Sequence, residues 1–373
     1  MTFEIKEVKG KKMMKDFIKF GNDLYKNHPY FVPSLMFDEL NTLDHKKNVN
    51  YKFCDGVEYL AYQDGKIVGR ICALINHRYN AKTKIDYLRF NRFDFIDDYN
   101  VSAALMNKVI EWGKARNMNT LNGPIGITDF DKQGLLVEGF DEDSMFITNY
   151  NYDYYPKHYE KLGLTKDVDW VEYRVFPPAQ LDPRIEKLSK AVAEKRKLHL
   201  VKFKKKKDLM PYIHKAFDTY NKAFDVLHGV TMLDQDQIDM YVDQFIGLMN
   251  YRYLHMVVDE KEDVVGFSVL VPSLSDAVRK SKGYLFPFGW YHILRALKKF
   301  HILDMYFIAV KPEYQGLGVN SLIMSDVIKC CFEDKVQFLE TGPELEDNLL
   351  VQAQWKGFNA PQVRRKRLYH REF

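Results

Sequence analysis

Cysteine is scarce in this sequence. Four of 373 residues are cysteines, and no C-x-x-C spacing or neighbouring histidine cluster accompanies Cys54, Cys72, Cys330 or Cys331. A disulfide framework and a zinc site of the usual ligand spacing are therefore not expected. We predict reduced, mostly buried thiols and no bound metal.

Long hydrophobic runs are also missing. Residues 1–6 lack the apolar run of a signal peptide, and no stretch approaches the roughly 18–20 apolar residues that cross a bilayer. We therefore expect a cytoplasmic protein. Peripheral contact with the inner face of the membrane is an alternative, raised by an aromatic segment described below.

An excess of charge of one sign is absent. The chain has 55 Lys and Arg against 51 Asp and Glu, a net charge of +4, which is too small to favour a nucleic-acid partner. Material for packed cores is plentiful, because 46% of the residues are hydrophobic and 14% are aromatic. At 373 residues the default expectation is two domains.

Two similar series of elements follow one another along the chain. In the first half, periodicity predicts a strand, a helix, a hairpin turning at Asp64-Gly65, a strand and an amphipathic helix, at residues 2–8, 13–25, 59–74, 88–96 and 103–116. In the second half it predicts a hairpin, a strand and a helix at residues 253–270, 304–310 and 321–331.

This shared order suggests duplication of one α/β unit, although two unrelated α/β halves are the simpler alternative. We place the boundary near Pro177-Pro178, before a predicted helix at 185–196 and a strand at 198–203. The predicted domains are residues 1–178 and 179–373.

A glycine-rich turn joins a strand to a helix in the second half. Gly316 and Gly318 stand where the backbone turns sharply and can approach a ligand closely. Free N–H groups in such a turn, with the positive end of the following helix, suit a diphosphate. A turn without a ligand is the plainer alternative.

The residues of this turn resemble the acetyl-CoA signature of GNAT acyltransferases. Gln315, Gly318 and Asn320 occupy the signature positions, and residues 310–314 and 322–323 are similar to that family as well. Asn320 departs from the small residue found there. The resemblance implies that acetyl-CoA or a longer acyl-CoA is bound as co-substrate by Ile308, Ala309, Val310, Gln315, Gly316, Leu317, Gly318, Val319 and Asn320.

Asn348 is similar to the asparagine that precedes the last helix of such enzymes and helps to hold the cofactor. It would serve equally as the N-cap of that helix. Both interpretations remain open from the sequence.

Acylation of an amine requires a base and a group that stabilises developing negative charge. Asp304 and Glu340 are candidate bases, with solvated strand-end charges as the alternative. The tyrosine acid of the GNAT pattern is missing from the second half, where Ala353 stands, whereas Tyr159 fills the place in the first half. Asp97 and Asp98 occupy the first half's loop position and would repel a diphosphate. We therefore predict that only the second half binds CoA, and that the first is a degenerate copy.

Nearly the whole chain resembles a bacterial family of tandem-GNAT proteins, some of which are implicated as ceramide synthases. The resemblance rests on residues 93–98, 122–126, 134–140, 283–289 and 345–348. It implies an α/β (α+β) fold of two GNAT-like domains, each a mixed, mostly antiparallel twisted sheet flanked by helices. It also implies an N-acyltransferase acting on a primary amine, either a small molecule or a long-chain, sphingoid-type lipid amine. A non-catalytic acyl-CoA-binding or scaffold protein and an aminoacyl-tRNA-dependent transferase are the alternatives.

Two inserted segments interrupt the duplication. Residues 273–299 are rich in aromatic side chains and end in Arg295, Lys298 and Lys299. They suit a lipid tunnel or an anionic membrane surface, with a helix packed over the core as the simpler explanation. Residues 126–155 suit either a lid over the acceptor or plain surface structure. The sequence carries no signal for the oligomeric state.

Overall fold

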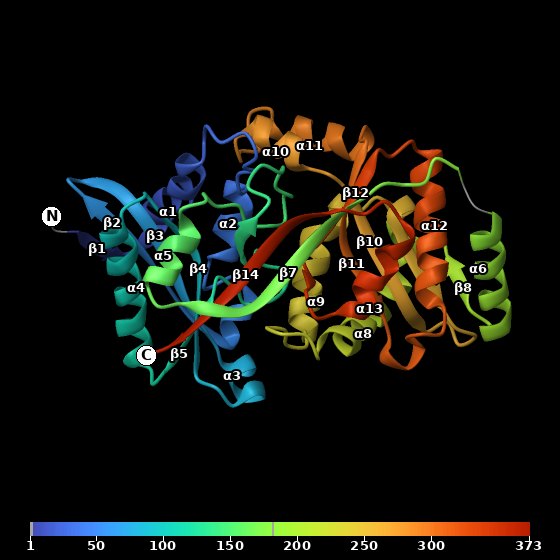
Figure 1. Ribbon diagram of the computed structural model, residues 1–373, viewed down its shortest axis with the longest axis horizontal. Coiled ribbons are helices and arrows are strands. Elements are labelled where there is room, and N and C mark those ends of the chain that lie inside the picture. Colours follow the sequence, from blue (N-terminus) through green and yellow to red (C-terminus); the bar gives the residue numbers. More distant parts are fainter. Residues whose placement is uncertain (1–2, 181–182) are drawn as a thin grey trace.

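The structure, a computed structural model, describes residues 3–180 and 183–373 (Figure 1). Its strands form one extended mixed sheet in the order β1-β2-β3-β4-β5-β14-β7-β12-β11-β10-β9-β8, with β6 paired to β14 and β13 paired to β7 off this path. Helices cover both faces. The expected mixed α/β fold with a mostly antiparallel sheet is confirmed.

The first half contains the elements that the sequence pattern predicted. Its strands are β1 (Glu4–Glu7), β2 (Cys54–Gln63), β3 (Lys66–Asn76), β4 (Tyr87–Phe95), β5 (Thr120–Gly123), β6 (Leu135–Glu138) and β7 (Thr165–Val175). Its helices are α1 (Gly10–Leu24), α2 (Met36–Thr42), α3 (His77–Thr83), α4 (Tyr99–Lys114) and α5 (Tyr155–Lys161). The β2–β3 hairpin turns at Asp64 and Gly65, whose φ angles of 50° and 75° are the positive values that a tight hairpin turn needs.

The second half repeats the order with added helices. Its strands are β8 (His199–Val201), β9 (Leu254–Val258), β10 (Val264–Pro272), β11 (Ile302–Val310), β12 (Phe338–Thr341), β13 (Glu344–Leu345) and β14 (Gln362–Glu372). Its helices are α6 (Pro183–Arg196), α7 (Lys206–Leu209), α8 (Ile213–Phe224), α9 (Gln235–Phe245), α10 (Ser275–Ser281), α11 (Gly289–Lys298), α12 (Val319–Glu333) and α13 (Leu349–Gln352), with the 3₁₀ turns η5 (Pro312–Tyr314) and η6 (Ala353–Gly357) beside the candidate site.

The strand pairings of the two halves correspond. In the first half β2, β3 and β4 pair antiparallel and β4 pairs parallel with β5. In the second half β9, β10 and β11 pair antiparallel and β11 pairs parallel with β12. Gly69 lies opposite Phe95 and Gly266 lies opposite Val310, so Phe95 and Val310 occupy corresponding positions.

The last strands of the two halves, β7 and β14, lie side by side at the centre of the sheet, and each also pairs with a strand of the other half. β14, from the end of the chain, lies between β5 and β7, while β7 also pairs with β12. The final strand of the predicted second domain therefore completes the sheet of the first. The domain boundary at residue 178 stays a prediction, because the strands of both predicted domains belong to one continuous sheet.

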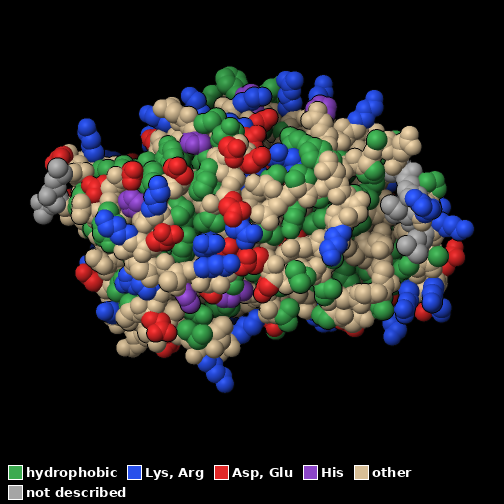
Figure 2. Space-filling model, in the orientation of Figure 1, with side chains coloured by type: hydrophobic (Ala, Val, Ile, Leu, Met, Phe, Trp, Pro, Cys, Tyr) green, Lys and Arg blue, Asp and Glu red, His purple; other side chains and the backbone are tan. Residues whose placement is uncertain are grey.

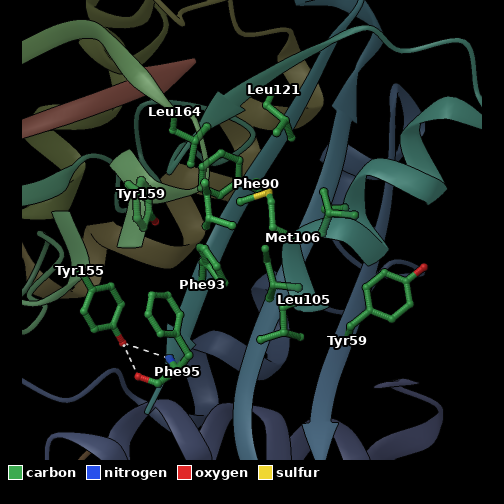
Figure 3. Packing of buried hydrophobic residues seen from close by; sticks show 14 of the residues in the cluster. Tyr59, Phe90, Phe93, Phe95, Leu105, Met106, Leu121, Tyr155, Tyr159 and Leu164 are labelled. Atoms are coloured by element: carbon green, nitrogen blue, oxygen red, sulfur yellow. Dashed lines mark hydrogen bonds between the residues drawn. The ribbon is translucent and has the colours of Figure 1, made fainter. Parts of the chain in front are cut away.

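Each half has its own packed interior. In the first half Phe90, Phe93 and Phe95 of β4 pack between α4 and α5, as Figure 3 shows. In the second half one cluster lies under α12, and another, around Phe267 and Met256, lies under α8 and α9. All four cysteines are free and buried, as expected. Within residues 3–180 and 183–373, no helix has the length and apolar character needed to cross a membrane.

Candidate active site

Strands β11 and β12 separate partway along their length. They pair in parallel only from Ile302 with Phe338 to Met305 with Thr341, whereas β11 continues to Val310. Beyond Thr341 the chain turns at Gly342, whose N–H donates to the Met305 carbonyl at 2.9 Å, and then pairs with β7 through β13. The two strands therefore diverge and leave a V-shaped gap.

A β-bulge lies at the point of divergence. Val269 pairs with Phe307 and Leu270 pairs with Met305, so Tyr306 is the extra residue on β11. Both Tyr306 and Phe307 line the cavity described next. Among the described residues the Tyr306 hydroxyl is buried without a hydrogen-bond partner, and burial raises its pKa well above the usual value, so that it stays protonated.

A cavity of about 290 Å³ adjoins the gap. The second half supplies most of its wall through α8, α9 and β9 to β11, and the first half supplies residues between Asp129 and Thr148. The lining is mainly aromatic and aliphatic, including Ile213, Phe217, Tyr220, Phe224, Tyr241, Phe245 and Met249. An apolar cleft with a few polar groups is typical of a small-ligand site, and this one suits a hydrocarbon chain.

Glu344 is a half-buried carboxylate in this cavity, just after the diverging end of β12. The indole N–H of Trp355 donates to its two oxygens at 2.9 and 3.2 Å, which fixes the side chain. Desolvation raises the pKa of Glu344 to about 8, although the Trp355 hydrogen bond opposes the shift. An oriented carboxylate that titrates near neutral pH suits a general base. The sequence reasoning missed it; its one signal was an acid placed after a strand and a Gly-Pro turn.

Asp129 is one of two carboxylates, with Asp131, that the first half contributes to the cavity lining. It accepts a hydrogen bond from the Tyr220 hydroxyl. Burial raises its pKa to about 6. The segment 126–155 therefore borders the cavity rather than forming surface structure alone.

The glycine-rich turn lies at the far end of β11. Gly316 and Gly318 have φ angles of 71° and 90°, and Gly318 is the N-terminal residue flanking α12. No side chain of the described residues caps this helix terminus. A Cβ at Gly316 would meet no atom within 4 Å, whereas one at Gly318 would lie 2.7 Å from Val192 of α6. The turn is therefore open at Gly316 and packed against α6 at Gly318.

Side-chain amides flank the turn. Gln315 donates to the Val310 carbonyl at 3.2 Å, and Asn320 donates to the Gln354 side-chain oxygen at 3.2 Å. The remaining amide atoms of Asn320 and Gln354 are buried and unpartnered in the described part of the chain. The Asn320 side-chain oxygen can therefore accept, and the Gln354 side-chain nitrogen can donate, a hydrogen bond to a polar group beside the α12 terminus.

The predicted donor-binding residues divide between two places. Ile308 and Asn348 line the cavity, whereas Leu317, Val319 and the other residues of the turn do not. Ala309 and Val310 connect the two on the same strand. Asn348 is the N-cap of α13 and accepts a hydrogen bond from the Val351 N–H at 3.4 Å. It thus has the capping role and also faces the cavity.

Asp304 and Glu340 lie opposite one another on β11 and β12, outside the cavity lining. Glu340 is held by Arg174 at 2.6 Å and by Arg364 at 2.5 Å. Asp304 is fully buried, and desolvation together with the Glu340 charge raises its pKa to about 8. Both remain predicted bases, but unlike Glu344 neither of them lines the cavity.

Tyr159 lies in the core of the first half, apart from the cavity. It borders a separate, more polar pocket of about 70 Å³, which is lined by residues of α1, β4, α5 and the segment 124–151. Its ring packs against Phe93 and Tyr369, with centroid distances of 5.6 and 5.0 Å. The structure does not bring Tyr159 together with the other predicted catalytic residues.

The loop of the first half is closed by its own side chains. Asp98 caps α4 by accepting from the Asn100 N–H at 2.8 Å, and Asp97 pairs with His158 at 2.9 Å. At Phe95, the counterpart of Val310, the Tyr155 hydroxyl accepts from the backbone N–H at 3.1 Å and the Tyr154 hydroxyl donates to the carbonyl at 2.6 Å (Figure 3 shows Tyr155 against Phe95). This supports the prediction that the first half has no CoA loop.

One cluster of metal-ligating side chains was not predicted. The ligand atoms of His255, Asp326 and Cys330 lie within 4.8 Å of one another beneath α12. Asp326 already pairs with the His255 Nδ1 atom at 2.7 Å and with Lys202. Burial raises the pKa of the Cys330 thiol, which disfavours the thiolate that would bind a metal.

Comparisons with known proteins place the fold. No family model matches the chain. It is 26% identical over 368 residues to "Protein YghO" of Escherichia coli, covering 96% of this chain and 93% of that protein. It is 24% identical over 291 residues to a "Bacterial ceramide synthase" of Caulobacter vibrioides, covering 76% of this chain and 74% of that protein.

Solved structures match along the full length. A tandem GNAT protein from the clavulanic acid biosynthesis pathway has a TM-score of 0.57 at 11% identity, covering 100% of this chain and 98% of that one. A probable N-acyltransferase of Enterococcus faecalis has a TM-score of 0.53 at 10% identity, covering 100% and 73%. These likenesses establish the tandem GNAT fold.

Proposed function

We propose that this chain, which has the tandem GNAT fold, transfers an acyl group from a coenzyme A thioester to an amine. The observation that carries the proposal is the gap between β11 and β12, which opens beside an apolar cavity containing the oriented carboxylate of Glu344. The relative from Caulobacter vibrioides is named a ceramide synthase, which supports amide formation on a long-chain amine.

The donor would bind along the free edge of β11 and the turn that follows it. The uncapped α12 terminus, with open space over Gly316, suits a diphosphate because unpaired N–H groups and the helix dipole attract anions. Backbone groups of Ile308, Ala309 and Val310 would face the pantetheine arm. Acetyl-CoA and longer acyl-CoA are both candidate donors, and the apolar lining favours a long chain on at least one substrate.

Amide formation then needs few protein groups. Glu344 first takes a proton from the ammonium group, and the neutral amine nitrogen then attacks the thioester carbonyl carbon. As the C–S bond breaks, the second proton lost from nitrogen passes to sulfur, which releases CoA as the thiol. The Tyr306 hydroxyl, protonated and without a partner among the described residues, is the candidate donor to the charge that develops on oxygen or sulfur.

Asp129 would receive the acceptor amine in its cationic form. It faces the same cavity as Glu344 from the opposite half of the molecule, so an amine with a hydrocarbon tail can lie between the halves. A primary amine of the long-chain, sphingoid type fits this lining better than a small polar amine.

The test measures binding and turnover separately. Thermal shifts with acetyl-CoA, palmitoyl-CoA and free CoA report binding, because a ligand of the folded state raises its apparent stability. Mass spectrometry then follows amide product, and thiol release follows CoA, with a sphingoid base and a short soluble amine as acceptors. The proposal expects stabilisation by a thioester and one amide per thiol released.

Absence of any thioester-induced shift would contradict the donor site. Binding without amide from either amine would favour a non-catalytic acyl-CoA-binding protein instead. Product formed only from aminoacyl-tRNA would favour the tRNA-dependent alternative.

A further inference from the structure

The inserted segment α10–α11 presents an aromatic surface to solvent. Its aromatic patch consists of Tyr284, Phe286, Phe288, Trp290, Tyr291 and Leu294, with exposed fractions from 43% at Tyr284 to 79% at Phe286. The opposite side of α11 is anchored, because Ile293 packs with Val278 of α10 and Val32 of the first half. The patch is therefore held in place by a buried face while its own side chains remain uncovered.

Basic side chains surround the patch. Exposed Lys280 and Lys282 lie at the end of α10, and exposed Arg295, Lys298 and Lys299 lie at the end of α11. Asp276 is the single acidic residue between residues 275 and 299, and Arg279 pairs with it at 2.7 Å. Figure 2 shows hydrophobic side chains on the upper edge of the molecule, over α10 and α11, with Lys and Arg side chains beside them.

We propose that the aromatic patch docks this protein on an anionic lipid bilayer. Aromatic rings favour the boundary between headgroups and acyl chains, and Lys and Arg at the same level are attracted to anionic headgroups. Both features occur on one anchored surface element. An uncompensated positive rim also disfavours the same surface of a second copy, whose charges would be of equal sign.

Two chain segments connect the packing beneath the patch with the cavity lining. Phe146 and Leu248 contact the cluster that anchors α11, while Ile147 and Met249, next to them in the chain, line the cavity. A lipid substrate delivered by the bilayer would reach the cavity beside these two segments. This delivery role rests on the proposed acyl transfer, whereas bilayer binding does not.

Vesicle co-sedimentation of the full chain tests the docking. We expect binding to equimolar phosphatidylcholine and phosphatidylglycerol vesicles and weak binding to phosphatidylcholine alone, with the difference reduced by salt. The variant F286S/F288S should lower binding to the anionic vesicles by at least about tenfold, and R295E/K298E/K299E should remove the preference for anionic lipid. The matched control F332S changes an exposed phenylalanine of α12 outside the patch, and should bind as the unmodified chain does.

Circular dichroism and acylation of a short soluble amine accompany each variant, so that misfolding and failure of the proposed function are recognised separately. Failure of the unmodified chain to bind anionic vesicles would overturn the proposal, as would unchanged binding by F286S/F288S. Conversion of a dimer into a monomer by that variant, seen in analytical ultracentrifugation, would assign the patch to self-association and also overturn it.

Discussion

The two halves of the molecule share a strand order but differ where a ligand would bind. In the first half the Tyr154 and Tyr155 hydroxyls satisfy the backbone of Phe95, and Asp98 caps the following helix. In the second half the corresponding strand ends in an open glycine turn, and no side chain of the described residues caps α12. The first half thus carries its own substitutes for a bound anion.

The two halves thus keep the same fold while differing in how the groups at the end of the strand are satisfied. The groups that a diphosphate or pantetheine would contact must be hydrogen-bonded in some way when they are shielded from water. Side chains from α5 and the α4 cap do this in the first half. In the second half Gln315 donates to the Val310 carbonyl, whereas the α12 terminus has no cap from a side chain of the described residues.

The largest expected effect is that of Glu344→Gln on turnover. Loss of the general base should lower kcat by about 10²–10⁴-fold with little change in acyl-CoA affinity. Glu344 is protonated below its raised pKa of about 8, so the activity of the unmodified protein should increase with pH towards that value. The variant should not show this increase. A pH–rate series measures both effects.

Trp355→Phe sharpens the same test. It removes the hydrogen bond that lowers the pKa of Glu344, so the rise of activity with pH should occur at higher pH while activity is retained. An unchanged profile in both variants would assign the base elsewhere, with Asp304 the next candidate.

Gly316→Asp should weaken thioester binding by at least about tenfold, because it places a negative charge at the open turn. Gly316→Asn is the matched control, since both residues tolerate a positive φ and differ in charge. Isothermal titration with acyl-CoA compares them. Equal affinities for the two variants would mean that the diphosphate does not bind at this turn.

Asp304→Asn should change how stability depends on pH. The folded state holds a proton on Asp304 up to about pH 8, while the unfolded chain releases it near pH 4, so the unmodified protein loses about 1.4 kcal/mol of unfolding free energy per pH unit between these values. The variant lacks this contribution, and the difference is measured by urea unfolding at several pH values. Parallel pH dependences of the two proteins would show that Asp304 is ionised when folded.

The smallest expected effect is that of Asp98→Ala. Loss of the α4 cap should cost about 1 kcal/mol of stability and leave acyl-CoA binding unchanged, because that helix belongs to the closed half. Thermal unfolding with and without ligand checks this. A change in the ligand-induced shift would contradict the division of roles between the halves.

Local signals predicted the local structure well. Alternation of apolar residues and the Asp64-Gly65 turn determined the hairpins, and the glycines of the 310–320 segment determined the strand-to-helix turn. The capping role of Asn348 was also among the stated alternatives. These features depend on residues close together in the chain.

Long-range contacts were beyond the sequence pattern. Glu344 is distinguished by its place in the cavity and by Trp355, and Tyr306 by a bulge set through pairing with β10. The ion pairs of Glu340 come from Arg174 and Arg364, each on another strand. Periodicity carries no information about such partners.

The pairing of β14 with β5 and β7 also affects folding during translation. The sheet edge at β5 is covered only when residues 362–372 reach it, and these follow all the other described strands in the sequence. A nascent first half would hold an exposed strand edge throughout translation of the second. The sheet can therefore close only after residues 362–372 have left the ribosome.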